Sequence, residues 1–250
     1  MAEMNADASD FATARQWIAD AAHIAVLTGA GVSAESGVPT FRDAQTGLWA
    51  RFRPEELATE DAFRRDPARV WDWYAHRRQM LRDVQPNAGH RALAVFQRRH
   101  PGRLTLVTQN VDGLHQRAGS EGVLCLHGDL FADRWLDAPR GCCRLDHAVA
   151  GSPPTCGGCG NWVRPGVVWF GEMLPPDALA AAERAAEHCD VMLVAGTSGQ
   201  VYPAAGLAHL ARRAGARVVI VNPEPTELDD TAHLVLPGTS AQLLPMLLTA

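Results

Sequence analysis

Apolar residues along the chain gather in short runs that are separated by longer stretches of mixed character. The runs are bounded by Gly, Pro, Asn or Asp, as buried strands commonly are, and they occupy residues 24–27, 104–107, 123–126, 167–170, 191–195, 218–221 and 234–236. Apolar residues at helical spacing fall between many of these runs, at residues 11–22, 67–84, 88–99, 176–188 and 203–214. Strands that alternate with helices predict an α/β fold with a doubly wound, Rossmann-like parallel sheet.

Residues 132–165 break this alternation, because they are rich in Gly, Pro and Cys and poor in periodic apolar residues. A stretch of that kind is typical of an insertion that needs support other than a packed apolar core. It holds four of the chain's six cysteines, and in a reducing compartment clustered cysteines indicate metal ligands before disulfides. We expect the other two, Cys125 and Cys189, to be buried as small apolar residues.

Bulk composition excludes several classes of partner. The 250 residues carry 28 acidic and 23 basic side chains, for a net charge of −5, whereas nucleic-acid-binding proteins usually have a basic excess or stripe. No apolar run approaches the roughly 18 residues of a membrane span, and the acidic segment 1–10 lacks the features of a secretion signal. We therefore expect a cytoplasmic protein with no direct nucleic-acid partner and no membrane contact.

A glycine pattern follows the first predicted strand. Gly29, Gly31 and Ala34 satisfy G-x-G-x-x-G/A in the strand-then-turn context of dinucleotide-binding proteins. The pattern favours phosphate binding, with Gly29 in a tight turn and Gly31 admitting a pyrophosphate to backbone amides. The alternative is that these glycines serve the turn alone.

The acidic residue that usually holds the adenosine ribose is missing. A dehydrogenase of this fold has an Asp or Glu about 20 residues after the glycine pattern, at the end of a second strand, but residues 39–49 read as a loop. The nucleotide would therefore be held in another way. Candidate ligands follow later strands, at residues 196–198 and 222–224, although the same residues would suit ordinary turns.

Six segments of the chain together resemble the sirtuin family of NAD-dependent protein-lysine deacylases, and within it the desuccinylase and demalonylase class. They are residues 29–42, 109–115, 126–128, 167–172, 196–198 and 222–224, and they occur in the family's order over residues 22–247. The resemblance implies that NAD is a co-substrate, that acylated-lysine proteins are the partners, and that nicotinamide and O-acyl-ADP-ribose are the products.

The resemblance also implies one catalytic domain over residues 1–250. Its large Rossmann-like part would consist of about 11–40, 85–131 and 166–250. Two small parts would be inserted, a helical one at about 41–84 that carries the cofactor loop and the acyl pocket, and a zinc-type knuckle at about 132–165.

The same resemblance implies the residues of the site. His127 would be the catalytic base, since imidazole is suited to deprotonate a ribose hydroxyl near neutral pH, and Asn110 and Asp112 would assist it. Read without the resemblance, His127 would be a structural or exposed histidine, and Asn110 or Asp112 a helix cap. The implied cofactor-binding residues are Gly29, Ala30, Gly31, Phe41, Arg42, Gln109, Asn110, Asp112, Gly196, Thr197, Ser198, Asn222, Glu224 and Ser240, and the implied peptide-binding residues are Val168, Phe170 and Gly171.

Tyr74 and Arg77 are three positions apart in a predicted helix, so they lie on one helix face. The pair resembles the Tyr-x-x-Arg signature of sirtuins that accept succinyl, malonyl or glutaryl lysine, because a guanidinium matches a carboxylate with two parallel hydrogen bonds. The alternative is a solvated helix face. Residues 41–49 differ from the shorter, Gly-rich segment of close desuccinylases, which leaves acetyl-lysine as an additional or preferred substrate.

A structural zinc held by two Cys-x-x-Cys pairs is implied by the family. Cys156 and Cys159 form the second pair, but the first is displaced to the adjacent Cys142 and Cys143, so either the ligands have moved or the site is degenerate and binds no zinc. Because adjacent cysteines seldom both bind one tetrahedral metal, His147 is an alternative fourth ligand.

Two rival functions remain open at the level of sequence. Mono-ADP-ribosyl transfer would use the same cleavage of NAD, and a non-catalytic NAD-sensing module would use only its binding. The intact His127 and the Tyr74–Arg77 pair favour the deacylase.

Overall fold

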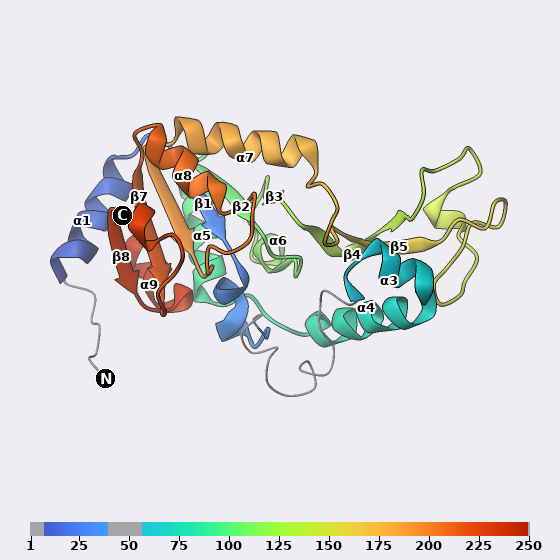
Figure 1. Ribbon diagram of the computed structural model, residues 1–250. Coiled ribbons are helices and arrows are strands. Elements are labelled where there is room, and N and C mark those ends of the chain that lie inside the picture. Colours follow the sequence, from blue (N-terminus) through green and yellow to red (C-terminus); the bar gives the residue numbers. More distant parts are fainter. Residues whose placement is uncertain (1–7, 40–56, 250) are drawn as a thin grey trace.

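A six-stranded parallel sheet forms the larger part of the molecule (Figure 1). The computed structural model describes residues 8–39 and 57–249. The strands follow the order β3-β2-β1-β6-β7-β8 across the sheet, with bounds β1 Ile24–Thr28, β2 Leu104–Thr108, β3 Leu124–Cys125, β6 Val191–Ala195, β7 Arg217–Asn222 and β8 Leu234–Pro237. Every pair of neighbours is parallel, which confirms the doubly wound α/β prediction.

Helices cover both faces of this sheet because alternate residues of each strand point to opposite faces. On one face, α1 (Ala8–Asp20), α5 (Ala88–Arg99) and α9 (Ser240–Leu247) pack on residues such as Val26 and Leu193. On the other, α7 (Pro176–His188) and α8 (Gly206–Arg213) pack on Leu27 and Val194. The short helix α6 (Leu114–Arg117) follows β2, and the 3-10 turns η1 (Ala30–Ser36) and η5 (Asp229–Thr231) follow β1 and precede β8.

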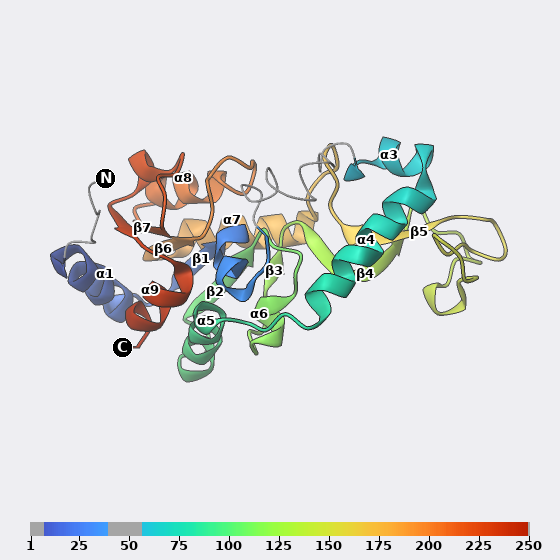
Figure 2. The same cartoon turned by 90° about the horizontal axis from the view of Figure 1, so that it is seen from below.

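A second group of elements lies at one end of the sheet (Figure 2). Strands β4 (Gly128–Trp135) and β5 (Val163–Val167) form an antiparallel pair of their own, beside the helices α3 (Glu60–Arg65) and α4 (Pro67–Arg82). Phe63, Tyr74, Leu130 and Trp169 are buried together between them. The residues between β4 and β5 form a knuckle with the 3-10 turn η4 (Leu145–His147).

The strand predicted at residues 167–170 is wrong. The strand in this region is Val163–Val167, and it pairs with β4 rather than with the parallel sheet. Beyond it, the Val168 amide donates to His127 and the Phe170 amide donates to Ala58. The Val168 bond extends the pairing with β4 by one residue, because His127 directly precedes Gly128, whereas the Phe170 bond goes to another segment. The apolar run therefore leaves the ladder even though it keeps an alternating pattern of burial.

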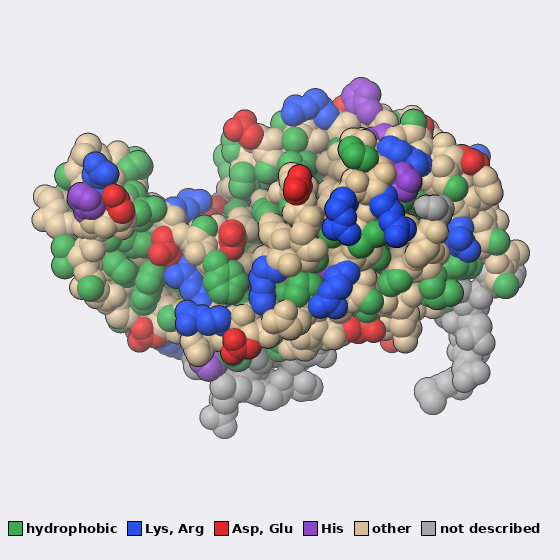
Figure 3. All heavy atoms as spheres, turned by 180° about the vertical axis from the view of Figure 1, so that it is seen from behind, with side chains coloured by type: hydrophobic (Ala, Val, Ile, Leu, Met, Phe, Trp, Pro, Cys, Tyr) green, Lys and Arg blue, Asp and Glu red, His purple; other side chains and the backbone are tan. Residues whose placement is uncertain are grey.

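Both signs of charge are spread over the face seen from behind in Figure 3. All 23 basic residues counted in the sequence are arginine, so the side chains coloured blue in Figure 3 are all arginine side chains. In the part of the chain that the structure describes, none of the helices is both long and apolar enough to span a membrane.

Candidate active site

The predicted cofactor residues follow the carboxyl ends of the parallel strands, which meet at one edge of the sheet. The chain leaves β1 toward β2 on one side, whereas β6 pairs with β1 on the other, so this edge includes the point where the strand order reverses. Ligands of open α/β sheets bind at such a point. The predicted residues at this edge are Gly29, Ala30, Gly31, Gln109, Asn110, Asp112, His127, Gly196, Thr197, Ser198, Asn222, Glu224 and Ser240.

Two glycines after β1 pack directly on the loop after β6. A Cβ on Gly29 would lie 2.7 Å from the Thr197 Cβ, and one on Gly31 would lie 2.8 Å from the Gly196 Cα. The Gly31 amide donates to the Gly196 carbonyl at 2.7 Å, and the Gly29 amide donates to Ala195 at 3.1 Å. Close backbone packing therefore requires glycine here, and these two amides are already bonded within the protein.

Asp112 lies in a buried hydrogen-bond network. Its carboxylate accepts from the Ser33 hydroxyl at 2.7 Å and from the Leu114 amide at 2.9 Å. The Asn110 side chain donates to the Ser33 oxygen at 3.1 Å, so the Ser33 proton is directed at the carboxylate. Burial raises the pKa of Asp112, and its hydrogen bonds oppose that shift.

His90 joins the same network from α5. The Asn87 amide donates to His90 Nδ1 as part of the cap of that helix, so Nε2 carries the proton and donates to the Ser33 oxygen at 3.3 Å. Burial lowers the pKa of His90 to about 4. Sequence reasoning missed both Ser33 and His90, and the only available signals were a serine inside the glycine motif and the spacing of Asn87 and His90 in a helix cap.

His115 forms a second buried group behind the first. Its ring lies 4.8 Å from that of His90, and its Nε2 lies 2.9 Å from the Thr28 hydroxyl. Burial lowers the pKa of His115 to about 3. Both histidines are therefore neutral, and they support the loops that present Asn110 and Asp112.

His127 lies between the sheet edge and the second group of elements. Its Nδ1 lies 2.9 Å from the Gln109 carbonyl, which makes Nδ1 the donor and leaves Nε2 unprotonated. Burial lowers the pKa of this half-buried imidazole. His127 is therefore neutral at neutral pH, with an Nε2 lone pair that no described residue engages.

The remaining predicted cofactor residues are held by contacts between loops. The Gln109 amide group donates to the Thr197 hydroxyl at 3.1 Å, and the Asn222 side chain donates to the Glu224 carbonyl at 2.6 Å. Ser240 is buried, and its hydroxyl has no partner among the described residues. Ser198 is half-buried. Phe41 and Arg42 lie outside the described residues.

The predicted peptide-binding segment connects to His127. Val168 donates its amide to the His127 carbonyl at 2.8 Å. The backbone amides of Val168 and Phe170 already have hydrogen-bond partners within the protein. A peptide substrate that paired with this segment as an additional strand would therefore bond other backbone groups of the segment. Gly171 is exposed with a φ of 87°, a conformation that favours glycine.

Tyr74 and Arg77 do share one face of α4. The Tyr74 hydroxyl accepts a hydrogen bond from Trp169 Nε1 at 3.0 Å. The Arg77 guanidinium lies 4.8 Å from the Trp73 ring centroid and 5.8 Å from that of Tyr74. Within the described residues it has no hydrogen bond or ion pair. Burial raises the pKa of Tyr74 and lowers that of Arg77.

Four cysteines meet in the knuckle, and all four sulfur atoms lie within 4.8 Å of one another. They are the predicted ligands Cys142, Cys143, Cys156 and Cys159. His147 is outside this group, so the alternative fourth ligand is not supported. Hydrogen bonds to Cys159 and Cys156 raise the pKa of the Cys142 thiol to about 12, whereas the Gly158 amide is the largest of the causes that lower the pKa of Cys156 to about 7. Four sulfurs this close suit a tetrahedral zinc ion, whose charge would keep them as thiolates.

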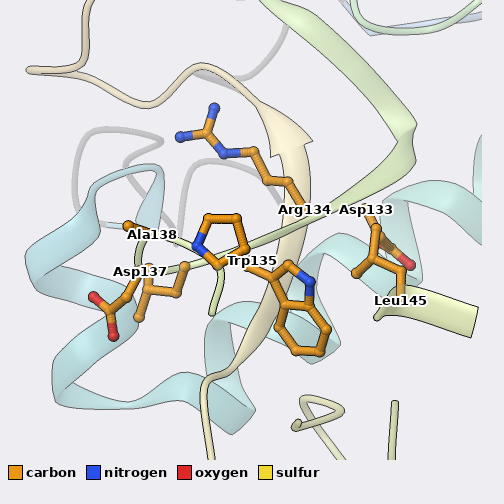
Figure 4. A pocket seen from close by; sticks show the side chains of 8 residues that line it. Asp133, Arg134, Trp135, Asp137, Ala138 and Leu145 are labelled. Atoms are coloured by element: carbon orange, nitrogen blue, oxygen red, sulfur yellow. The ribbon is translucent and has the colours of Figure 1, made fainter. Parts of the chain in front are cut away.

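Two hollows in the surface border this knuckle rather than the sheet edge. One, of about 400 Å³, is lined by the end of β4 and the segment that follows, with Trp135 between Asp137 and Leu145 (Figure 4). The other, of about 550 Å³, lies beside Cys159 and Trp162. Neither contains His127 or Arg77.

Comparisons with known proteins identify relatives of this chain. A model of the Sir2 family matches residues 29–203. A protein named NAD-dependent protein deacylase from Ralstonia nicotianae is 60% identical over 244 residues, 97% of each chain. A protein of the same name from Mycolicibacterium paratuberculosis is 51% identical over 90% of this chain and 96% of its own.

Solved structures are similar over nearly the whole chain. The crystal structure of a Sir2 homolog–NAD complex has a TM-score of 0.85 at 42% identity and covers 99% of this chain and 95% of the other. A structure of Sir2 bound to an acetylated peptide has a TM-score of 0.79 at 30% identity, with 92% and 94% covered.

Proposed function

This chain belongs to the Sir2 family, and we propose that it is an NAD-dependent protein deacylase that removes acidic acyl groups, such as succinyl and malonyl, from lysine. The deacylase activity is supported by the 60% identical relative of that name. The preference for acidic groups rests on Tyr74 and Arg77.

The state of Arg77 is the observation that carries the acyl preference. Its guanidinium is half-buried and loses hydration, which lowers its pKa, yet no described residue offers it a hydrogen-bonded carboxylate. The charge of Asp112 opposes this decrease, but Asp112 does not hydrogen-bond the guanidinium, and a partly desolvated cation without a hydrogen-bonded anion is less stable than a paired one. A ligand carboxylate would supply the missing partner in two parallel hydrogen bonds.

Tyr74 would supply a further donor to the same carboxylate. Its oxygen already accepts from Trp169, so its own proton remains for a ligand. Burial raises its pKa, which keeps the phenol protonated and able to donate. Acetyl-lysine lacks the carboxylate and would gain nothing from either group.

His127 would act as the base. In the proposed reaction the acyl oxygen of the substrate attacks the nicotinamide ribose and nicotinamide leaves. The unprotonated Nε2 of His127 then takes a proton from a ribose hydroxyl, while the Gln109 carbonyl holds the ring in the required tautomer. Asn110 and the buried Asp112 would bind the nicotinamide carboxamide and ribose, and Ser33 would fix the orientation of Asp112.

Zinc would have a structural role. The four clustered cysteines would fill all positions of a tetrahedral ion, which leaves none open for substrate.

We also propose that the chain is divided into one large Rossmann-like part and two inserted parts, and that the protein is cytoplasmic.

The test compares peptides that carry succinyl-, malonyl- and acetyl-lysine, with and without NAD, by mass spectrometry. Arg77→Met should selectively slow removal of the acidic groups. Arg82→Met is the matched control, because it makes the same change at an exposed position of α4. If only acetyl is removed, the acyl preference is wrong and the family activity stands. If no acyl group is removed, mono-ADP-ribosyl transfer or NAD sensing becomes the better explanation.

A further inference from the structure

We propose that Trp169 and Arg164 are positioning residues for the acyl group, acting through the Tyr74 hydroxyl. The inference rests on the proposed function, because it concerns Tyr74, which is assigned above to the acyl carboxylate. Trp169 is 1% exposed and Arg164 is fully buried. Trp169 contacts the Tyr74 hydroxyl and Arg164 contacts the Trp169 ring, so both would act on the acyl group only through the equally buried Tyr74.

The contact between Trp169 and Tyr74 fixes the direction of one proton. An indole N–H can only donate, and it donates to the phenol oxygen at 3.0 Å. With that lone pair engaged, the phenol hydrogen turns away from Trp169. The indole therefore selects the rotation of the Tyr74 hydroxyl in which the proton is free for a ligand.

Arg164 holds the indole in place. Its guanidinium carbon lies 3.3 Å from the centroid of the Trp169 ring, so the planar cation covers one face of the indole. The same guanidinium donates to the Val167 carbonyl at 2.6 Å and to both oxygens of Glu172. The Glu172 carboxylate in turn accepts the Trp169 backbone amide at 2.8 Å.

These contacts form a closed loop around residues 164–172. The ion pair joins the two ends of the segment, and Trp169 is fixed at its ring and at its backbone. Val168, in the same segment, bonds His127. One hydrogen-bonded segment thus connects the proposed base, the proposed peptide-binding backbone and Tyr74.

The choice of Arg and Trp is specific to this arrangement. A lysine could pair with Glu172 but could not cover the indole and donate to Val167 at the same time. A phenylalanine would keep an aromatic ring at this position but could not donate to Tyr74. Each substitution therefore removes one identified link.

The experiment is a double-mutant cycle at Trp169 and Tyr74. Its readout is the succinyl preference, which is kcat/KM for a succinyl-lysine peptide divided by kcat/KM for the matching acetyl-lysine peptide. Trp169→Phe should lower this ratio roughly five-fold, the size of one net hydrogen bond. Tyr74→Phe should lower it at least as much. The double variant should show the Tyr74→Phe ratio with no further loss, because Trp169 acts through Tyr74.

Trp162→Phe is the matched control, since Trp162 packs near Phe63 in the same apolar cluster but has no hydrogen bond to Tyr74. It should leave the ratio unchanged. Arg164→Lys should lower the ratio in the same direction as Trp169→Phe.

The outcomes separate the two proposals. If Tyr74→Phe lowers the ratio but Trp169→Phe does not, or if the two effects add, the positioning role is wrong and the acyl pocket stands. If Tyr74→Phe leaves the ratio unchanged, the acyl pocket itself is wrong, and the positioning role is overturned with it.

Discussion

The site has two regions, the sheet edge around Asp112 and the region of Tyr74 and Arg77, which we call the acyl end. They differ in how completely their polar side chains are hydrogen-bonded. At the sheet edge, Asp112, Ser33, Asn110 and His90 bond one another, so this part of the site keeps its geometry without a ligand. At the acyl end, Tyr74 accepts one hydrogen bond and Arg77 has none within the described residues. A ligand that binds beside Asp112 meets polar groups that already bond one another, whereas a ligand carboxylate beside Arg77 would supply the hydrogen-bond partner that this guanidinium lacks.

The largest effect should come from the residue that joins the two regions. His127→Ala removes the proposed base, and we expect kcat/KM to fall by about 10²–10⁴-fold for every acyl group. NAD binding, measured by calorimetry, should survive. An unequal loss between succinyl and acetyl peptides would contradict a base that serves both regions.

Loss of the metal should disturb the acyl end before the sheet edge. Trp71 of α4 packs on the cluster that contains Trp135 and Cys156, so the knuckle supports the helix of Tyr74 and Arg77. Cys142→Ser should reduce the bound zinc, which we expect at about one ion per chain, and weaken the knuckle by several kcal/mol. Metal analysis and thermal unfolding would measure both effects. Cys125→Ser, outside the cluster, should change neither.

A change at the sheet edge should lower all activities equally. In Asp112→Asn, one amide oxygen replaces two carboxylate acceptors, so either Ser33 or Leu114 loses its partner, at about 1–3 kcal/mol. We expect lower stability in urea and an unchanged ratio of succinyl to acetyl removal. Asp129→Asn makes the same change where the carboxylate only accepts the Phe131 amide. A shifted ratio in Asp112→Asn alone would show that the two regions are coupled.

The buried histidines should make stability depend on pH. An unfolded histidine has its pKa near 6.5, but the folded values are about 4 for His90 and about 3 for His115. At a pH between the unfolded and the folded pKa, each of these histidines is protonated in the unfolded chain but not in the folded one. The free energy of unfolding should therefore decrease as pH falls below about 6.5, by about 1.4 kcal/mol per pH unit for each histidine.

Urea unfolding at several pH values would measure this slope. His115→Gln should reduce it, while His76→Gln, at an exposed position, should not. Equal slopes in the two variants would mean that the buried pair does not govern the acid sensitivity.

The smallest effect is expected at the acyl end. Arg77→Lys keeps the charge but loses the planar fork, and we expect about a five-fold decrease in kcat/KM for succinyl peptides. Acetyl removal should be unchanged. If lysine serves as well as arginine, charge alone accounts for the recognition.

The sequence predicted the sheet edge well because its strands are short apolar runs that end in Gly, Gln or Asn. It could not predict the network behind Asp112, since Ser33 and His90 are single polar positions without periodicity. The run at 167–170 misled because burial continues to alternate after Val167, where the pairing of β5 with β4 ends. The sequence did not decide which residues bind the metal on the side of Cys142 and Cys143. The path of a Gly- and Pro-rich loop cannot be predicted from the spacing of its cysteines.

The guanidinium groups of Arg77 and Arg164 are representative of the whole chain, in which all 23 basic residues are arginine. Lysine becomes acylated when the lone pair of its ε-amine attacks an activated acyl carbon, whereas a guanidinium stays protonated and delocalised. A reagent that acylates the lysines of other proteins meets no ε-amine within these 250 residues. The cation proposed to recognise an acyl carboxylate therefore cannot be masked by the modification that the protein is proposed to remove.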